Sequence, residues 1–262
     1  LTQLPGSYGT LGLVTRATLE LGEAKPFVRS RYHRFSRRAD YVRAFAAALD
    51  EHAFVEGFVL APDHYVLVAS DFSDRVASLD QFAAMTPGSR WYYQHASDQA
   101  RAGAEDLVPS YQYLFRHQRS LLWISGVIAD LALFCETRWG RAFVDRRVES
   151  HLRTSGLQGN LPIELVERCL VYQDMGMLLG RLEEGIAYVQ ERLGVYPLWN
   201  CPAGPVALDP AATDVPFTIP RRLVGKRDMM VDIGIYGEPT VRDYRNFDAM
   251  PALQKFVDIP SL

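Results

Sequence analysis

The sequence predicts an α+β fold, in which one antiparallel sheet carries helices on one face. An order of strand, helix, strand and strand can be inferred between residues 27 and 72, and a comparable order recurs between residues 170 and 236. An insertion of aromatic and helical character separates the two stretches, at about residues 89–158. We therefore expect two β-α-β-β units that share one sheet.

The first unit begins with a predicted strand over Phe27–Phe35. Ser36 is the expected N-cap of a helix, because a serine side chain can accept a hydrogen bond from the first helical turn. Strands are then predicted over Phe54–Leu60 and Tyr65–Phe72, on either side of the turn sequence Ala61-Pro62-Asp63-His64. The helix presents an apolar face at helical spacing, made by Tyr41, Val42, Phe45 and Leu49.

The second unit has the same order of elements. A short strand is predicted over Leu170–Asp174, and further strands over Tyr196–Asn200 and Met229–Tyr236. A proline-rich loop over Pro202–Pro220 separates the last two strands. The helix between the first and second strands presents an apolar face made by Leu179, Leu182, Ile186, Val189 and Leu193.

Three glycines, Gly6, Gly9 and Gly12, stand three residues apart and lead into an alternating segment, Leu11–Leu21, that predicts a strand. Their spacing differs from the G-x-G-x-x-G of a Rossmann nucleotide fold, and a strand rather than a helix is expected after them. A helix N-terminus that binds phosphate is therefore a poor interpretation. By spacing alone, such a glycine-rich turn is more often structural than ligand-binding.

Composition restricts the classes of function. The 262 residues have a formal net charge of -3, which argues against a general nucleic-acid binder because no basic excess exists to neutralise phosphates. Cys135, Cys169 and Cys201 are far apart, as expected for reduced thiols. The sequence has no C-x-x-C or H-x-x-x-H spacing, so a zinc site has little support. We expect an intracellular, metal-independent protein.

The longest apolar run, Leu121–Phe134, is shorter than the roughly 20 residues that a membrane-spanning helix needs. It predicts a buried or partly lipid-facing helix. The chain also opens without an initiator methionine, in the middle of a motif, so we expect it to be a fragment.

The amino-acid sequences of several segments also resemble those of a known protein family. The opening, from Gly6 to Leu21, resembles the segment that closes the FAD domain in flavoproteins of the vanillyl-alcohol-oxidase type. Further segments look like the delta(24)-sterol reductase branch of these flavoproteins, and they keep their order over nearly the whole chain. They are residues 24–29, 52–57, 91–95, 113–120, 173–175, 195–202 and 231–239.

The resemblance implies an FAD-dependent oxidoreductase that reduces a carbon-carbon double bond of a sterol or related isoprenoid lipid, with NADPH as the hydride donor. Residues 1–22 would complete the FAD-binding domain, and residues 23–262 would form the substrate or cap domain. The larger FAD-binding portion would lie upstream. The FAD contacts that the resemblance implies are Gly6, Ser7, Gly9, Thr10, Gly12 and Val14.

Reduction of an alkene also needs a proton donor, for which tyrosine, histidine and protonated carboxyl groups are suitable. The candidates lie in one short segment: Tyr111, Tyr113, Arg116 and His117. The alternative is an arginine-paired loop that holds the insertion on the sheet. Glu56 and His95 are expected to be satisfied, partly buried residues. Candidate substrate contacts on or near the predicted strands are Asp174, Tyr196, Asn200, Tyr236 and Glu238.

Two other functions stay open at this level. A flavoprotein of the same wider type could oxidise an alcohol or hydroxy acid instead of reducing an alkene. A cap without catalysis could serve as a lipid-binding module. Peripheral membrane association is also open, because sterols are dissolved in membranes, so we expect a cytoplasmic or membrane-associated location.

Overall fold

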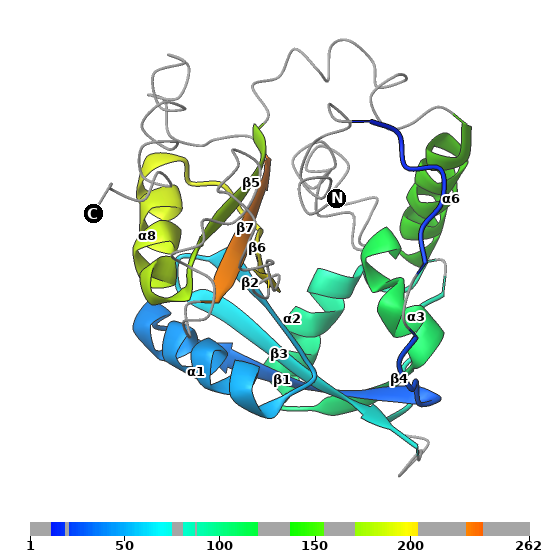
Figure 1. Cartoon of the computed structure of the whole chain (residues 1–262), viewed down its shortest axis with the longest axis horizontal. Coiled ribbons are helices and arrows are strands. Elements are labelled where there is room, and N and C mark those ends of the chain that lie inside the picture. Colours follow the sequence, from blue (N-terminus) through cyan, green and yellow to red (C-terminus); the bar gives the residue numbers. More distant parts are fainter. Residues whose placement is uncertain are drawn as a thin grey trace.

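The computed structural model describes residues 12–18, 21–74, 81–86, 88–119, 137–154, 171–203 and 229–237. Its strands form one sheet of seven, in the order β4-β1-β3-β2-β6-β7-β5 (Figure 1). All neighbouring strands run antiparallel. The predicted α+β class with an antiparallel sheet is confirmed.

The first β-α-β-β unit contains β1 (Phe27–Phe35), α1 (Arg38–Glu51), β2 (Phe54–Ala61) and β3 (His64–Ser73). Its strands agree with the prediction to within a residue or two. The predicted N-cap is wrong: the helix starts at Arg38, so that Arg37 takes the cap position, with extended backbone and no side-chain cap hydrogen bond. Asp40 in the first turn supplies a negative charge near the helix N-terminus instead.

The second unit contains β5 (Val171–Leu178), α8 (Leu182–Arg192), β6 (Leu198–Ala203) and β7 (Met230–Gly237). β5 is longer than predicted. β6 begins only at Leu198, because proline at the preceding position has no N–H to donate to a ladder. The two units meet where β2 pairs with β6, so the sheet is continuous across both.

The helical character predicted for the insertion is found in its described residues, 89–119 and 137–154 apart from the strand β4, and the apolar run predicted as a helix over 121–134 lies outside the described residues. The insertion contains α2 (Tyr92–Ala102), α3 (Ser110–Leu114) and α6 (Arg138–Thr154), with the short 3-10 helix η2 (Arg116–Arg119) after α3. It also contributes a strand, β4 (Glu105–Pro109), which pairs with β1 and extends the edge of the sheet. The insertion is therefore part of the same layered structure as the two units.

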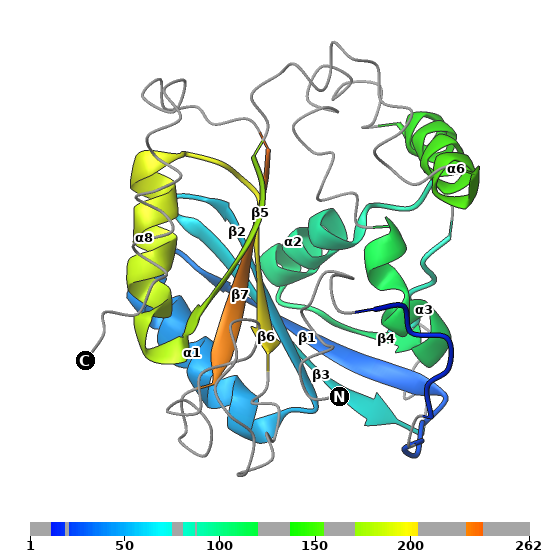
Figure 2. The same cartoon turned by 45° about the horizontal axis from the view of Figure 1, so that its top comes forward.

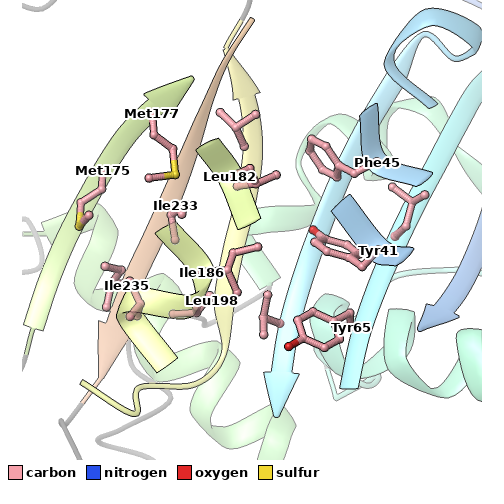
Figure 3. Packing of buried hydrophobic residues seen from close by; sticks show 14 of the residues in the cluster. Tyr41, Phe45, Tyr65, Met175, Met177, Leu182, Ile186, Leu198, Ile233 and Ile235 are labelled. Atoms are coloured by element: carbon pink, nitrogen blue, oxygen red, sulfur yellow. The ribbon is translucent and has the colours of Figure 1, made fainter. Parts of the chain in front are cut away.

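Helices lie on both faces of the sheet (Figure 2). The helices of the two units, α1 and α8, pack on one face, which we call the covered face. Figure 3 shows its core, in which Leu182 and Ile186 from α8 lie next to Ile233 of β7, and Tyr41 and Phe45 from α1 lie next to Tyr65 of β3. Burial of this large apolar surface is the main stabilising contribution to the fold.

The prediction that helices occupy only one face is wrong, because α2 packs on the opposite face. β1 and β3 are apolar on that side as well. Burial of the second apolar surface requires a helix there, and α2 from the insertion supplies it. The buried residues of this second cluster are Tyr32, Phe58, Val66, Val68, Tyr92, Ala96 and Ala100.

The alternating segment predicted as a strand over Leu11–Leu21 has no strand in its described residues, 12–18 and 21. Leu13 and Leu21 are each 90% exposed. Alternation forms a strand only where a partner satisfies the backbone and one face is buried. The described part of the chain pairs no strand with this segment.

Candidate functional site

The side chains of greatest chemical interest lie on the sheet face opposite α1 and α8. Over β2, β6, β7 and β5 we call this surface the polar face. Side chains alternate between the two faces of a strand. Because Val55, Leu198, Ile233 and Met175 belong to the covered core, the residues next to them in sequence point the other way. The polar face is therefore formed by Glu56, Trp199, Cys201, Asp232, Tyr236 and Asp174.

Glu56 is the centre of one hydrogen-bond network on the polar face. Its side chain is 3% exposed, and its two oxygens accept four hydrogen bonds. The donors and distances are Tyr92 Oη at 2.9 Å, Arg116 Nε at 2.8 Å, His117 Nε2 at 2.8 Å and Trp199 Nε1 at 3.0 Å. A buried carboxylate with this many donors has a fixed position.

The charges around Glu56 keep it ionised. Burial alone would raise the pKa of this carboxyl, but the attraction of Arg116 and His117, together with their hydrogen bonds, lowers the pKa well below its ordinary value. Glu56 in turn raises the pKa of Arg116 against the opposing effect of burial. The guanidinium also lies 4.0 Å from the ring centroid of Tyr113, a cation-π distance.

His117 is positioned by Glu56 and by two aromatic rings. Its ring centroid is 4.5 Å from that of Trp199 and 5.5 Å from that of Tyr92. Because ionised Glu56 can only accept, Nε2 must carry a hydrogen and donate it. The other nitrogen, Nδ1, is buried and has no partner among the described residues. It is a hydrogen-bonding atom beside Trp199 that a ligand could engage.

A second group of side chains lies farther along the polar face. The Tyr236 hydroxyl donates a hydrogen bond to Asp174 Oδ1. Asp232 pairs across the ladder with Cys201. Burial and the neighbouring Asp174 raise the pKa of Asp232 to about 6, and burial raises the pKa of the Cys201 thiol to about 11. This group holds a carboxyl that titrates close to neutral pH.

Gly234 makes room for the Tyr236 ring. A Cβ atom at Gly234 would lie 2.7 Å from Cε2 of Tyr236, which is too close. The ring therefore lies over the glycine on the polar face. Together with Trp199 it gives this face a flat aromatic surface between its polar groups.

The structure separates the other candidate residues. Tyr113 is buried under the Arg116 guanidinium, whereas Tyr111 is 73% exposed and contacts Phe115 with ring centroids 4.8 Å apart. Asn200 is fully buried on the covered face and donates a hydrogen bond of 2.8 Å to Tyr41. Tyr196 packs against the same covered core. Asp174 and Tyr236 are brought together, and Asn200 and Tyr196 lie on the other side of the sheet.

The residues that the resemblance assigns to FAD lie mostly outside the described residues. Gly12 and Val14 are described, and both are exposed. Gly12 has φ of +150°, which favours glycine, and a Cβ there would have nothing within 4 Å. The assignments that fall outside the described part of the chain are Gly6, Ser7, Gly9, Thr10 and Glu238.

Glu56 and Asp232 were not proposed from the sequence as residues of the site. Glu56 is interpreted there as a satisfied residue, which it is, but its central place in the network was missed. The signal was available: it is the one charged residue in the buried strand sequence Phe-Val-Glu-Gly-Phe-Val-Leu-Ala. Asp232 had a weaker signal, as an aspartate that alternates with Val231 and Ile233 in β7.

A separate network fixes α2 on the sheet. Buried Asp106 accepts a hydrogen bond of 2.9 Å from the Tyr32 hydroxyl, and its other oxygen is bonded to His95 Nε2 on α2. His95 is thus a hydrogen-bonded residue, in agreement with its interpretation from the sequence.

Among the described residues, no three His, Cys, Asp or Glu side chains are grouped as metal ligands. No described helix is both long and apolar enough to cross a membrane.

Comparison with curated proteins finds delta(24)-sterol reductases. The chain is 26% identical over 263 residues to Delta(24)-sterol reductase of Homo sapiens and 24% identical over 286 residues to that of Arabidopsis thaliana. It is 24% identical over 264 residues to a Delta(24)-sterol reductase homolog of Caenorhabditis elegans. These matches cover 96–97% of this chain and 48% of each relative. The chain thus spans about half the length of the curated relatives it matches, and no family model matches it.

Proposed function

We propose that this chain forms the substrate side of an FAD-dependent oxidoreductase that reduces a carbon-carbon double bond of a sterol or related isoprenoid lipid. The similarity to delta(24)-sterol reductases is the observation that carries the proposal. It extends over 97% of the chain, so the whole polar face lies within the similar region. The similarity supports this family and, with it, an oxidoreductase.

The polar face has the side chains that such a reaction needs. Trp199 and Tyr236 offer flat apolar surface for a hydrocarbon substrate. Nδ1 of His117 has no partner among the described residues and would offer a hydrogen-bonding atom to a planar, polar-edged ring system such as a flavin. The exposed backbone at Gly12 belongs to the segment that the resemblance assigns to FAD. When bound, FAD supplies the hydride chemistry.

The Glu56 network fixes the side chains that would border the substrate. Ionised Glu56 holds the Trp199 indole and the His117 ring in fixed orientations through one hydrogen bond each. Arg116 balances the charge of Glu56, so the carboxylate can stay buried. The Tyr92 ring is buried and the Trp199 ring is partly buried beside this network, and with substrate bound they would help to keep water from the reacting groups.

Product analysis tests the activity. The protein at its natural length, with NADPH and a side-chain-unsaturated sterol, should yield a sterol with two more hydrogens. Trp199→Ala should lower kcat/KM at least about 10-fold, since it removes the flat surface and one donor to Glu56. Phe82→Ala, at a 44% exposed ring that bridges to Leu107 of the edge strand β4, is the control and should leave the rate unchanged. Oxygen consumption with alcohols and no sterol product would instead favour the oxidase function.

A second experiment tests the cofactor. Gly9→Val should abolish retention of FAD, read as bound-flavin absorbance, while circular dichroism shows the sheet intact. Gly22→Val is the control, because a Cβ there has nothing within 4 Å. Unchanged flavin absorbance in Gly9→Val would remove the FAD assignment from the opening segment. Sterol binding by a protein without flavin would favour the non-catalytic lipid-binding module.

We also propose peripheral association with a membrane surface through α6. Trp139 and Phe143 are one helical turn apart and are 85% and 53% exposed. Arg138 and Arg146 are exposed, whereas Asp145 is turned inward to bond the Trp91 indole and the Gly88 amide. An outward face of aromatic and basic residues matches the chemistry of an anionic lipid surface.

A further inference from the structure

We propose that Asp232 is the catalytic acid that gives the proton to the alkene, with Asp174 and Tyr236 as positioning residues. This inference rests on the proposed function, because it names the proton donor of that same reaction. Asp232 lies in the middle of β7, on the polar face with Trp199 and Glu56. It is outside the segment in which the sequence suggested a proton donor.

The surroundings of Asp232 are suited to hold a proton. Its ladder partners are Cys201 on β6 and Gly176 on β5. Gly176 has no side chain, and the terminal methyl of Met230 fills that space, 2.8 Å from where a Cβ would lie. The carboxyl is therefore bordered by a thiol and an apolar methyl, and no described side chain is shown to donate a hydrogen bond to it.

The charges that face Asp232 come from three elements. Asp174 on β5 is negative, and no described lysine or arginine forms a salt bridge with it. Glu56 on β2 is negative too, but Arg116 on η2 compensates it at 2.8 Å. The uncompensated charge next to Asp232 is thus another carboxylate, which favours the protonated form of Asp232. Burial adds to this effect, and the pKa of Asp232 rises to about 6.

The other acidic groups on this face are less suitable. Glu56 is ionised and accepts four hydrogen bonds, so it has no proton to give. The Tyr236 proton is held by Asp174, and burial and that carboxylate raise the pKa of the phenol further. The thiol of Cys201, with a pKa of about 11, is a weak acid. A donor with a pKa near the working pH is the most effective one.

In the proposed step, the O–H bond of the Asp232 carboxylic acid breaks and a C–H bond forms at one alkene carbon. A bound reduced flavin would supply the hydride that the other carbon needs. The alkene gains a proton and a hydride, and the hydride donor is oxidised by two electrons. Asp232 is left as a carboxylate and takes up a proton from water. The hydrogen bond from Tyr236 keeps Asp174 beside it.

The first test measures the titration of Asp232 itself. A carboxyl signal in carbon-13 NMR of labelled protein should titrate near pH 6, and it should disappear in Asp232→Asn. In Asp174→Asn the same signal should move to lower pH, because the neighbouring negative charge is removed. Absence of such a signal, or no movement in Asp174→Asn, would overturn the inference, whatever the activity of the protein.

The second test separates the two half-reactions at natural length. Asp232→Asn should lower sterol reduction by about 10²-fold or more, with the rate of FAD reduction by NADPH unchanged, and Asp232→Glu should recover part of the loss. Asp98→Asn, at a partly exposed carboxylate of α2, should have no effect. A wild-type protein that reduces no sterol contradicts the proposed function. A wild-type protein that does so, with an equally active Asp232→Asn, contradicts only the inference.

Discussion

The two faces of the sheet have opposite characters. The covered face is closed by α1 and α8 over an apolar core, in which Tyr41 and Asn200 form a hydrogen-bonded polar pair. The polar face has carboxylates, a thiol and aromatic rings at the equivalent strand positions, and Asp174 is exposed there. The same strands build both faces, because successive side chains alternate.

We expect substitutions on the covered face to change mainly the stability of the fold, and substitutions on the polar face to change mainly the chemistry of the site. On the covered face a side chain is constrained by packing, and changes in volume are expected to reduce stability. On the polar face charge and hydrogen bonding dominate, so changes there are expected to alter pH dependence and ligand contacts. Glu56 is the exception, since it lies on the polar face but is as buried as a core residue. Three variants compare the two faces and a fourth, on α6, tests a surface outside both; they follow from the largest expected effect on stability to the smallest.

Glu56→Gln should give the largest loss of stability, about 3–5 kcal/mol, because it leaves the partly buried Arg116 guanidinium without its counter-ion. Since the pKa of Glu56 is below its ordinary 4.5, its stabilising contribution is present at neutral pH and is lost as the pH falls below about 4.5. Urea unfolding of wild type and variant at pH 7 measures the loss of stability, and the same experiment at pH 4 measures how much smaller that loss becomes. A variant that matches wild type at pH 7 would show that the network adds no net stability.

Gly57→Ala tests packing on the covered face. The new Cβ would lie 1.8 Å from the Tyr41 hydroxyl oxygen, so that Tyr41 must move and its hydrogen bond from Asn200 is strained. We expect a loss of about 1–3 kcal/mol in the free energy of unfolding. Combination with Tyr41→Phe should recover part of it, and Gly22→Ala, in open space, should cost less. An equal cost at both glycines would argue against steric overlap at Gly57.

Asp232→Asn should change stability modestly and in a pH-dependent way. The pKa of Asp232 is raised from 3.8 to about 6, so the folded state holds more protons than the unfolded state between these values. Wild-type stability from this group therefore falls as the pH rises from about 4 to 6. At pH 8 Asp232→Asn should be more stable than wild type, because it removes a charge that burial and Asp174 disfavour. The gain should be only roughly 1 kcal/mol, because the side chain is partly exposed and solvent screens its charge. Thermal unfolding from pH 4 to 8 checks the slope, and identical slopes would contradict the assignment.

The double substitution Trp139→Ser and Phe143→Ser should have the smallest effect on folding, within about 0.5 kcal/mol, because both rings are exposed. It should nevertheless reduce co-sedimentation with vesicles that contain anionic phospholipid. Phe82→Ser, at a 44% exposed ring on another part of the surface, is the control. Unchanged vesicle binding, or a change of oligomeric state instead, would contradict a lipid contact at α6.

Much of the fold could be predicted from the sequence because its local patterns are strong. Strand β1 was predicted with its observed bounds, and the apolar face of α8 contains Leu182, Ile186 and Val189, all buried as expected. The predictions failed where a local pattern depends on a distant partner. The segment before residue 22 alternates but has no strand in its described residues, and β4 enters the sheet only because β1 has a free edge.

The candidate site was less predictable than the fold. His117 and Arg116 were found as candidates, but the carboxylate that orients both lies about 60 residues earlier in the chain. Asn200 and Tyr236 were grouped as substrate contacts, yet they lie on opposite faces of the sheet. To assign a side chain to one face of the sheet, one must know which alternate residues of its strand point into the core. An error of one residue in this alternation moves every side chain of the strand to the opposite face.

The sequence by itself determined the α+β class, most strands and helices, the buried helix faces and the resemblance to delta(24)-sterol reductases. These features depend on residues close together in the chain or on the order of its segments. Only the tertiary structure decided that β2 lies next to β6, which brings Trp199 to Glu56 across 143 positions. The pairing of β7 with β6 and β5 likewise places Asp232 where burial and the neighbouring Asp174 raise its pKa. Burial and charge act through space, and chain spacing does not specify which strands become neighbours.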